Sequence, residues 1–236
     1  SENVGRDIVR LVAEGFGIES DLADGPALAL GVSESTLIEM TGAYAGILNG
    51  GSAVAPYGLR SLTIRGDDTP VMEQGGGIGE RVIQEGAARQ LTWMMHQVVE
   101  TGTGARAQIA GHQLAGKTGT TNENRDAWFV GFSGDYVVGV WMGFDDNAPM
   151  RGVTGSGVPA EVWRRTMEGV LTGLPATPLP MTPPDGIAGD TLAISEALRI
   201  NPSLDVLVAS GLYDLVTPFF DAEFTLNRHG IPAGRI

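Results

Sequence analysis

Apolar residues recur every three or four positions in four stretches of the chain. These stretches are residues 7–18, 35–51, 80–104 and 160–171. This spacing places the apolar side chains on one face of an amphipathic helix, and glycines near the ends of the first three stretches act as stop signals. We therefore predict four helices at these places.

For two of the predicted helices the sequence also indicates the residue that caps the helix or the residues that face the core. At the start of the second helix, either Ser35 or Thr36 can act as the N-cap, because both are short hydroxyl residues before the first apolar position. In the last helix we expect Val162, Met167 and Val170 to face the core.

Other segments show the two-residue period of β-strands. Residues 57–77 alternate on both sides of residues 66–68, whose Gly-Asp-Asp sequence is typical of a hairpin turn. Residues 113–121, 126–134 and 135–144 are rich in β-forming residues and are separated by short turns. The pattern predicts an antiparallel meander with helices packed on it, which is an α+β fold.

Composition narrows the classes of partner. The formal net charge of −13 argues against nucleic acid, because phosphate binding needs clustered Lys and Arg. The chain has no Cys, and its three histidines lack the spacing of metal ligands, so we expect no metal site and no cofactor. No apolar run approaches about 18 residues, so we expect no membrane-spanning segment in this chain.

The only lysine lies in the stretch AGKTGTT. If this stretch is a strand, Lys117 and Gly119 share one face while Thr118 and Thr120 share the other. A lysine beside hydroxyl groups can hold a carboxylate, and a glycine lets another backbone approach closely. This stretch is therefore the strongest candidate for a ligand-binding site.

The surroundings of this lysine resemble a known family. Residues 4–173, and above all the stretch TWMMHQVVETGTGARAQIAGHQLAGKTGTTNENRDAWFVGF, look like the transpeptidase domain of class A penicillin-binding proteins. The resemblance implies a serine β-lactamase-like fold, a periplasmic or cell-envelope setting, and a D-Ala-D-Ala stem peptide of peptidoglycan or a β-lactam as ligand.

The resemblance also implies roles for individual residues. The K-T-G motif of the family falls on Lys117, Thr118 and Gly119, and Thr120 and Thr121 follow it. By this match Lys117, Thr118 and Thr120 are candidate catalytic residues, whereas Gly119 and Thr121 are candidate substrate-binding residues.

Two further motifs of the family involve serine. Ser1 and Asn3 match the S-x-N motif in letters, and we include them as candidate substrate-binding residues. The S-x-x-K motif, which supplies the nucleophile and its base, is absent from the sequence, because Leu114 stands three residues before Lys117.

A different resemblance concerns the end of the chain. Residues 191–236 resemble a segment of bacterial serine carboxypeptidases, in which Asp214 would be the triad carboxylate, although no G-x-S-x-G nucleophile motif is present. Residues 174–190 are proline-rich and are predicted to form a linker between this segment and residues 1–173.

These observations leave three functions open. The first is a partial penicillin-binding transpeptidase with residual ester or amide hydrolysis near Lys117. The second is a non-catalytic composite fragment. The third is an unconventional hydrolase, including a glycoside hydrolase, that uses carboxylates such as Asp145 or Asp214. An incomplete sheet would also expose an edge strand, which favours self-association into a homo-oligomer.

Overall fold

A three-stranded antiparallel sheet forms the centre of the structure. The computed structural model describes residues 5–184. The strands follow one another as a meander in the order β5-β6-β7: β5 (Ala115–Thr120), β6 (Asp126–Phe132) and β7 (Val137–Gly143). This confirms the predicted meander and the α+β class.

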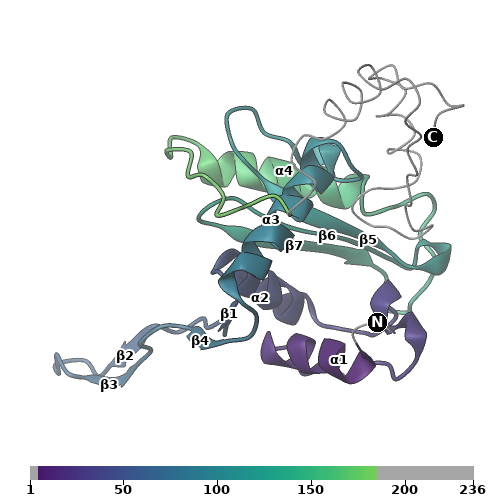
Figure 1. Cartoon of the computed structure of the whole chain (residues 1–236). Coiled ribbons are helices and arrows are strands. Elements are labelled where there is room, and N and C mark those ends of the chain that lie inside the picture. The colour runs from purple at the N-terminus through teal and green to yellow at the C-terminus, as the bar shows by residue number, and fades with distance from the viewer. Residues whose placement is uncertain (1–4, 185–236) are drawn as a thin grey trace, which may run out of the picture. The chain divides into compact units, whose positions relative to one another are not determined.

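All four predicted helices are present. They are α1 (Arg6–Gly15), α2 (Leu37–Leu48), α3 (Glu85–Glu100) and α4 (Val158–Leu171). Helices α2 and α4 lie on opposite faces of the sheet, and α1 packs on α2 (Figure 1). Three short 3₁₀ turns complete the helical structure: η1 (Pro26–Leu30), η2 (Ala105–Ala107) and η3 (Asn122–Asn124).

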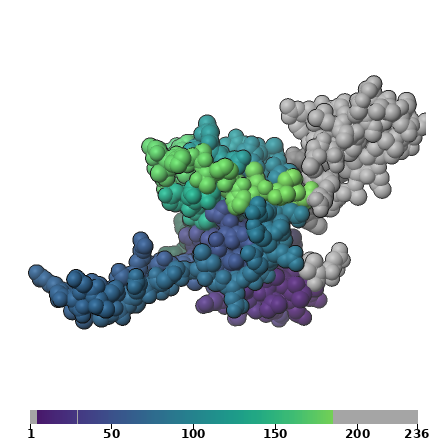
Figure 2. All heavy atoms as spheres, turned by 60° about the vertical axis from the view of Figure 1, so that its left-hand side comes forward, coloured from purple at the N-terminus to yellow at the C-terminus, as the bar shows by residue number. Residues whose placement is uncertain are grey.

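A long hairpin connects α2 to α3. Its outer part is the predicted hairpin of β2 (Ser61–Thr63) and β3 (Pro70–Glu73). The sequence patterns missed its base, where β1 (Ser52–Val54) pairs with β4 (Ile78–Arg81), and β4 includes the first residues of the predicted helix 80–104. Nearly every residue from 55 to 81 is exposed, and Figure 2 shows this hairpin extending from the body of the unit as an arm.

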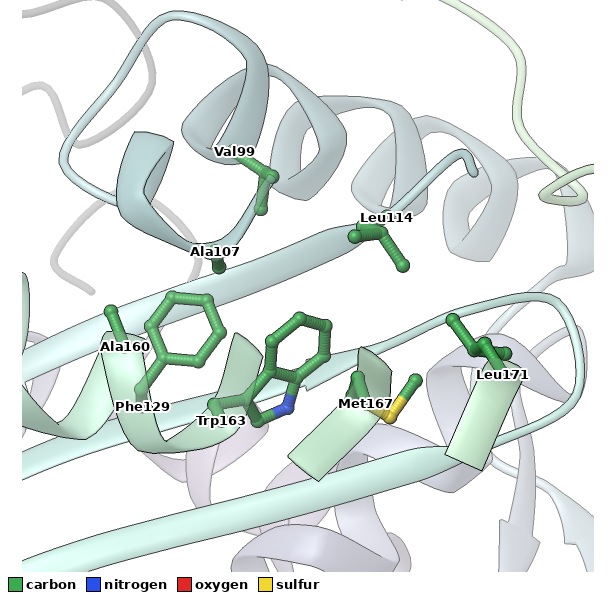
Figure 3. Close-up of a cluster of buried hydrophobic side chains, with 8 residues drawn as sticks. All are labelled: Val99, Ala107, Leu114, Phe129, Ala160, Trp163, Met167 and Leu171. Carbon is green, nitrogen blue, oxygen red and sulfur yellow. The ribbon is translucent and has the colours of Figure 1, made fainter. Parts of the chain in front are cut away.

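The largest buried cluster lies between α4, β6 and the end of α3. Its side chains, drawn in Figure 3, are those of Val99, Ala107, Leu114, Phe129, Ala160, Trp163, Met167 and Leu171. The ring of Phe129 meets the indole of Trp163 edge-to-face with centroids 5.2 Å apart. The Trp163 indole also donates a hydrogen bond to the Val138 carbonyl at 3.0 Å, so one side chain joins α4 to two strands.

This cluster corrects one expectation about α4. Met167 faces the core as predicted, but Val162 and Val170 are 42% and 37% exposed. The buried stripe instead runs through Trp163, Met167 and Leu171 at four-residue spacing, because the large indole takes the centre of the interface.

The segment after α4 has no helix or strand up to residue 184, yet part of it packs on the sheet. Leu179 is buried with Met95, Ala115 and Phe132, and its N–H donates to the Gln113 side chain at 3.0 Å. The first compact unit of the chain ends at Thr182. No helix within residues 5–184 is both long enough and apolar enough to cross a membrane.

The N-terminus of α2 is fixed by a network around one carboxylate. The Thr36 hydroxyl accepts from the Glu39 N–H, and the Glu39 carboxylate accepts from the Thr36 N–H, which is a capping box. The same carboxylate accepts from the N–H groups of Glu19 and Ser20. These hydrogen bonds, that from Thr36 above all, lower the pKa of Glu39 to about 2.

Replacing Glu39 should therefore change how stability depends on pH. Because its folded-state pKa lies below its usual value of 4.5, the charged Glu39 stabilises the fold above about pH 5, and this contribution is lost as the pH falls toward 2. We expect Glu39→Gln to lower the free energy of unfolding by about 1 kcal/mol at pH 7, as loss of an N-cap does. Urea unfolding at several pH values should show this difference shrinking toward pH 2. The exposed Glu34→Gln is the control, and an equal effect of both variants would contradict the prediction.

Candidate functional site

The strand β5 presents two different chemical faces, as its sequence predicts. Lys117 lies opposite Val130 and Gly139 across the sheet. On this face α2 approaches so closely that a Cβ on Gly139 would lie 2.3 Å from the Thr41 hydroxyl. Thr118, by contrast, lies opposite Phe129, on the face that packs against α4.

The Lys117 side chain is half-buried and stays close to its own strand. Its amine donates a hydrogen bond to the Thr118 carbonyl at 2.7 Å. Burial lowers the pKa of this amine from its usual value, because the charged form loses contact with water. A partly desolvated amine interacts more strongly with an incoming anion than a fully exposed one does.

The hydroxyls of the opposite face are held by segments distant in sequence. Thr103, just after α3, places its hydroxyl 2.8 Å from that of Thr118. The N–H of Gly155, just before α4, donates to the Thr120 hydroxyl at 3.0 Å. Neither contact follows from the sequence patterns, although each partner stands in a glycine-rich stretch, TGTG or TGSG.

Gly155 lies directly over the pair formed by Gly119 and Trp128. A Cβ on Gly155 would stand 2.5 Å from the Gly119 carbonyl oxygen and 2.4 Å from that of Trp128. This close approach depends on the missing side chain of Gly155, whereas a Cβ on Gly119 would meet the Trp128 side chain at 3.2 Å. The approach of a ligand backbone expected at Gly119 stays a prediction. The loop before α4 thus packs on β5 from the face that carries Thr118 and Thr120.

Thr121 belongs to the turn that follows β5. Its hydroxyl accepts from the Asp126 N–H at 2.8 Å and lies 3.2 Å from the Asp126 carboxylate. The Trp141 indole donates to the other oxygen of this carboxylate at 3.0 Å. Asp126 therefore joins the end of β5 to β7.

The same turn contains strained backbone. Glu123 and Asn124 have φ values of 60° and 54°, in the left-handed region that few non-glycine residues adopt. Arg125 stabilises the turn through the Glu123 carboxylate and the Asn147 carbonyl. Such strain next to a candidate site is typical of functional loops.

The remaining candidate residues lie elsewhere. Asp145 and Asp146 are exposed in the loop after β7, where Asp146 accepts from the Ala148 N–H. Ser1, Asn3 and Asp214 lie outside the described residues. Within residues 5–184, no three His, Asp or Glu side chains gather as a metal site would require.

Known proteins that resemble this chain identify its family. The profile of the penicillin binding protein transpeptidase domain matches residues 5–168, which include the whole of β5. The chain belongs to the penicillin-binding protein transpeptidase family. It is a partial transpeptidase-like domain related to the enzymes that cross-link peptidoglycan.

Individual relatives show the extent of the likeness. Penicillin-binding protein 1B of Escherichia coli is 38% identical over 165 residues, which are 69% of this chain and 19% of that protein. Penicillin-binding protein 1A of Pseudomonas aeruginosa is 31% identical over an alignment that covers 89% of this chain and 30% of that protein. This alignment is longer than residues 5–184, so it includes part of the C-terminal segment.

Solved structures show the same fold. The PonA1 protein of Mycobacterium tuberculosis, solved in complex with penicillin V, matches with a TM-score of 0.62 and 25% identity over 73% of this chain and 51% of that chain. The chain spans less than a third of the length of the two curated relatives named above. The predicted resemblance of residues 191–236 to serine carboxypeptidases stays a prediction, because these residues lie outside those that the structure describes.

A side chain at Gly155 should distort the site. We expect Gly155→Ala to lower the free energy of unfolding by about 3 kcal/mol, because its Cβ would collide with two backbone carbonyls that cannot move independently of the sheet. Gly169→Ala in α4 is the matched control. Nothing lies within 4 Å of its added Cβ, so this change should stabilise the helix by up to about 1 kcal/mol. Denaturant unfolding that shows both variants shifted in the same direction would contradict the prediction.

Proposed function

We propose that β5 is the ligand-binding edge strand of this transpeptidase-like chain. In this proposal the carboxylate of an acyl-D-Ala-D-Ala stem peptide or of a β-lactam lies at the open edge of β5, where the Lys117 amine approaches it from one face of the strand and the Thr118 hydroxyl from the other. Gly119, Thr120 and Thr121 line the path of the ligand along the strand. The observation that supports it most directly is the half-buried amine of Lys117 beside the only K-T-G sequence of the chain.

The position of β5 in the sheet supports this proposal. Among the described residues, β5 is an outer strand, because it pairs only with β6. Helix α3 packs on its beginning, where His96 lies 2.7 Å from the Leu114 carbonyl. The Lys117–Thr120 end is half-buried to exposed. An outer strand of this kind can bind an extended peptide through backbone hydrogen bonds.

The chemistry of known ligands of the family also supports it. PonA1 has been solved with penicillin V, a β-lactam that carries one carboxylate. In a chain with a net charge of −13, a carboxylate ligand needs a local cation to overcome the general repulsion. Lys117 supplies this cation, and the Thr118 hydroxyl adds a donor.

Binding is better supported than turnover. Acyl transfer needs a nucleophile activated by a neighbouring base. Among the described residues, the one hydrogen-bond partner of the Lys117 amine is the Thr118 carbonyl, which is not a nucleophile. The expected ester or amide hydrolysis near Lys117 therefore has no activated hydroxyl among these residues, and we assign this part of the chain a binding role.

The role of Lys117 can be measured by titration with penicillin V. We expect Lys117→Ala to weaken binding about tenfold or more, because a hydrogen bond to a charged group contributes roughly 1.5–3 kcal/mol. Lys117→Arg should keep much of the affinity, since it preserves the positive charge. Arg165→Ala, which removes a charge from the exposed side of α4, is the control. Isothermal titration calorimetry that shows equal affinities for wild type and Lys117→Ala would reject the proposal.

Covalent labelling separates binding from acylation. A fluorescent penicillin followed by mass mapping should give reversible binding to this chain without a covalent adduct. A serine adduct would show that the chain acylates and would overturn the restriction to binding.

A further inference from the structure

We propose that Thr103 is a positioning residue that orients the Thr118 hydroxyl toward the ligand carboxylate. This inference rests on the proposed function of β5 and adds a residue outside the K-T-G sequence to it. The observation behind it is the 2.8 Å contact between the two hydroxyl oxygens.

The loop that carries Thr103 is held firmly at the end of α3. The N–H of Gly102 donates to the Gln97 carbonyl and that of Gly104 to the Val98 carbonyl, at 3.1 and 2.9 Å. The Gln108 amide donates to the Val99 and Glu100 carbonyls at 2.9 and 2.8 Å, which satisfies the last turn of the helix. The loop therefore presents Thr103 from a fixed backbone.

The two glycines beside Thr103 bring this loop close to α3. A Cβ on Gly102 would stand 3.0 Å from the Val98 carbonyl oxygen, and a Cβ on Gly104 would stand at the same distance from it. The Cβ on Gly104 would also lie 3.3 Å from the ring of Phe129, the residue opposite Thr118 in the sheet. The residues that pack are thus the neighbours of Thr103, while Thr103 itself is exposed.

The hydrogen bond between the Thr103 and Thr118 hydroxyls has a definite donor and acceptor when an anion is bound. A hydroxyl has one donor hydrogen and two acceptor lone pairs. If Thr118 donates its hydrogen to a carboxylate, its oxygen is left to accept, and Thr103 can donate to it. Each hydrogen bond in such a chain polarises and strengthens the next. Thr103 therefore fixes the rotamer of Thr118 and favours the orientation that donates to the ligand.

Thr103→Val tests this role, because it replaces the hydroxyl by a methyl group of similar size. We expect it to weaken binding of penicillin V roughly three- to tenfold, the usual effect of one neutral hydrogen bond. Binding of the penicillin V methyl ester, which lacks the carboxylate charge, should change less. Thr103→Ser, which keeps the hydroxyl, should bind penicillin V as tightly as the wild type does. Thr101→Val is the matched control, since its hydroxyl lies in the same loop but contacts the Gln97 carbonyl.

A second measurement needs no ligand. Three-bond couplings to the Thr118 methyl group in NMR spectra report its χ1 rotamer in the free protein. We expect one rotamer in the wild type, Thr103→Ser and Thr101→Val, and rotamer averaging in Thr103→Val. A single rotamer in all four proteins would overturn the positioning role.

The two proposals can fail separately. If neither Lys117→Ala nor Thr103→Val changes the affinity for penicillin V while Thr118 averages in Thr103→Val, the ligand-binding function is wrong and the positioning contact is real. If Lys117→Ala weakens binding and Thr103→Val does not, the function holds and Thr103 has no part in it. Equal melting temperatures of the Thr103 and Thr101 variants exclude unfolding as the cause.

Discussion

The contact between Phe129 and Trp163 is the interaction on which the candidate site depends. It holds α4 against β6, while the Trp163 indole bonds to the Val138 carbonyl in β7. Helix α4 begins at Val158, only a few residues after Gly155. The packing of one large indole therefore helps to determine where the Gly155 loop meets β5, on the same face of the sheet as Thr118 and Thr120.

The site combines a charged face with a hydroxyl face on a single strand. Lys117 lies on the face covered by α2, and Thr118 and Thr120 lie on the face covered by α4. Each face is supported by different elements, so the amine and the hydroxyls that we propose to bind the ligand are held independently. This arrangement agrees with a rigid binding edge, because rigid elements keep functional groups in place better than free loops do.

Much of the fold could be predicted from the sequence, for reasons that differ between elements. The helices and the meander have long periodic stretches and short turns, so their local signals are strong. Strands β1 and β4 have only three and four residues, and their pairing spans the whole hairpin, so no local pattern reveals them. The prediction for the inward face of α4 was wrong at Val162 and Val170, because the burial of the larger Trp163 side chain decides the orientation of the helix.

The candidate site, like the fold, has one part that the sequence predicts and one part that it does not. The K-T-G stretch and the alternation of its side chains follow from the letters of one strand. The contacts of Thr103 and Gly155 join segments 15 and 35 residues away from their partners. The residue pattern within one stretch does not show which distant segments will meet, and the structure shows that glycines beside both residues allow close backbone packing.

The exposed hairpin between α2 and α3 has a consequence for how the sequence can vary. Its residues beyond Val54 and before Val82 are almost all exposed, so few of them constrain the core. Lengthening a connection of this kind costs little, because the entropy of loop closure grows only slowly with length. Insertions in pairs would also preserve the alternation of its strands. This hairpin is therefore the part of the unit in which evolution can change length and surface chemistry with the least effect on β5.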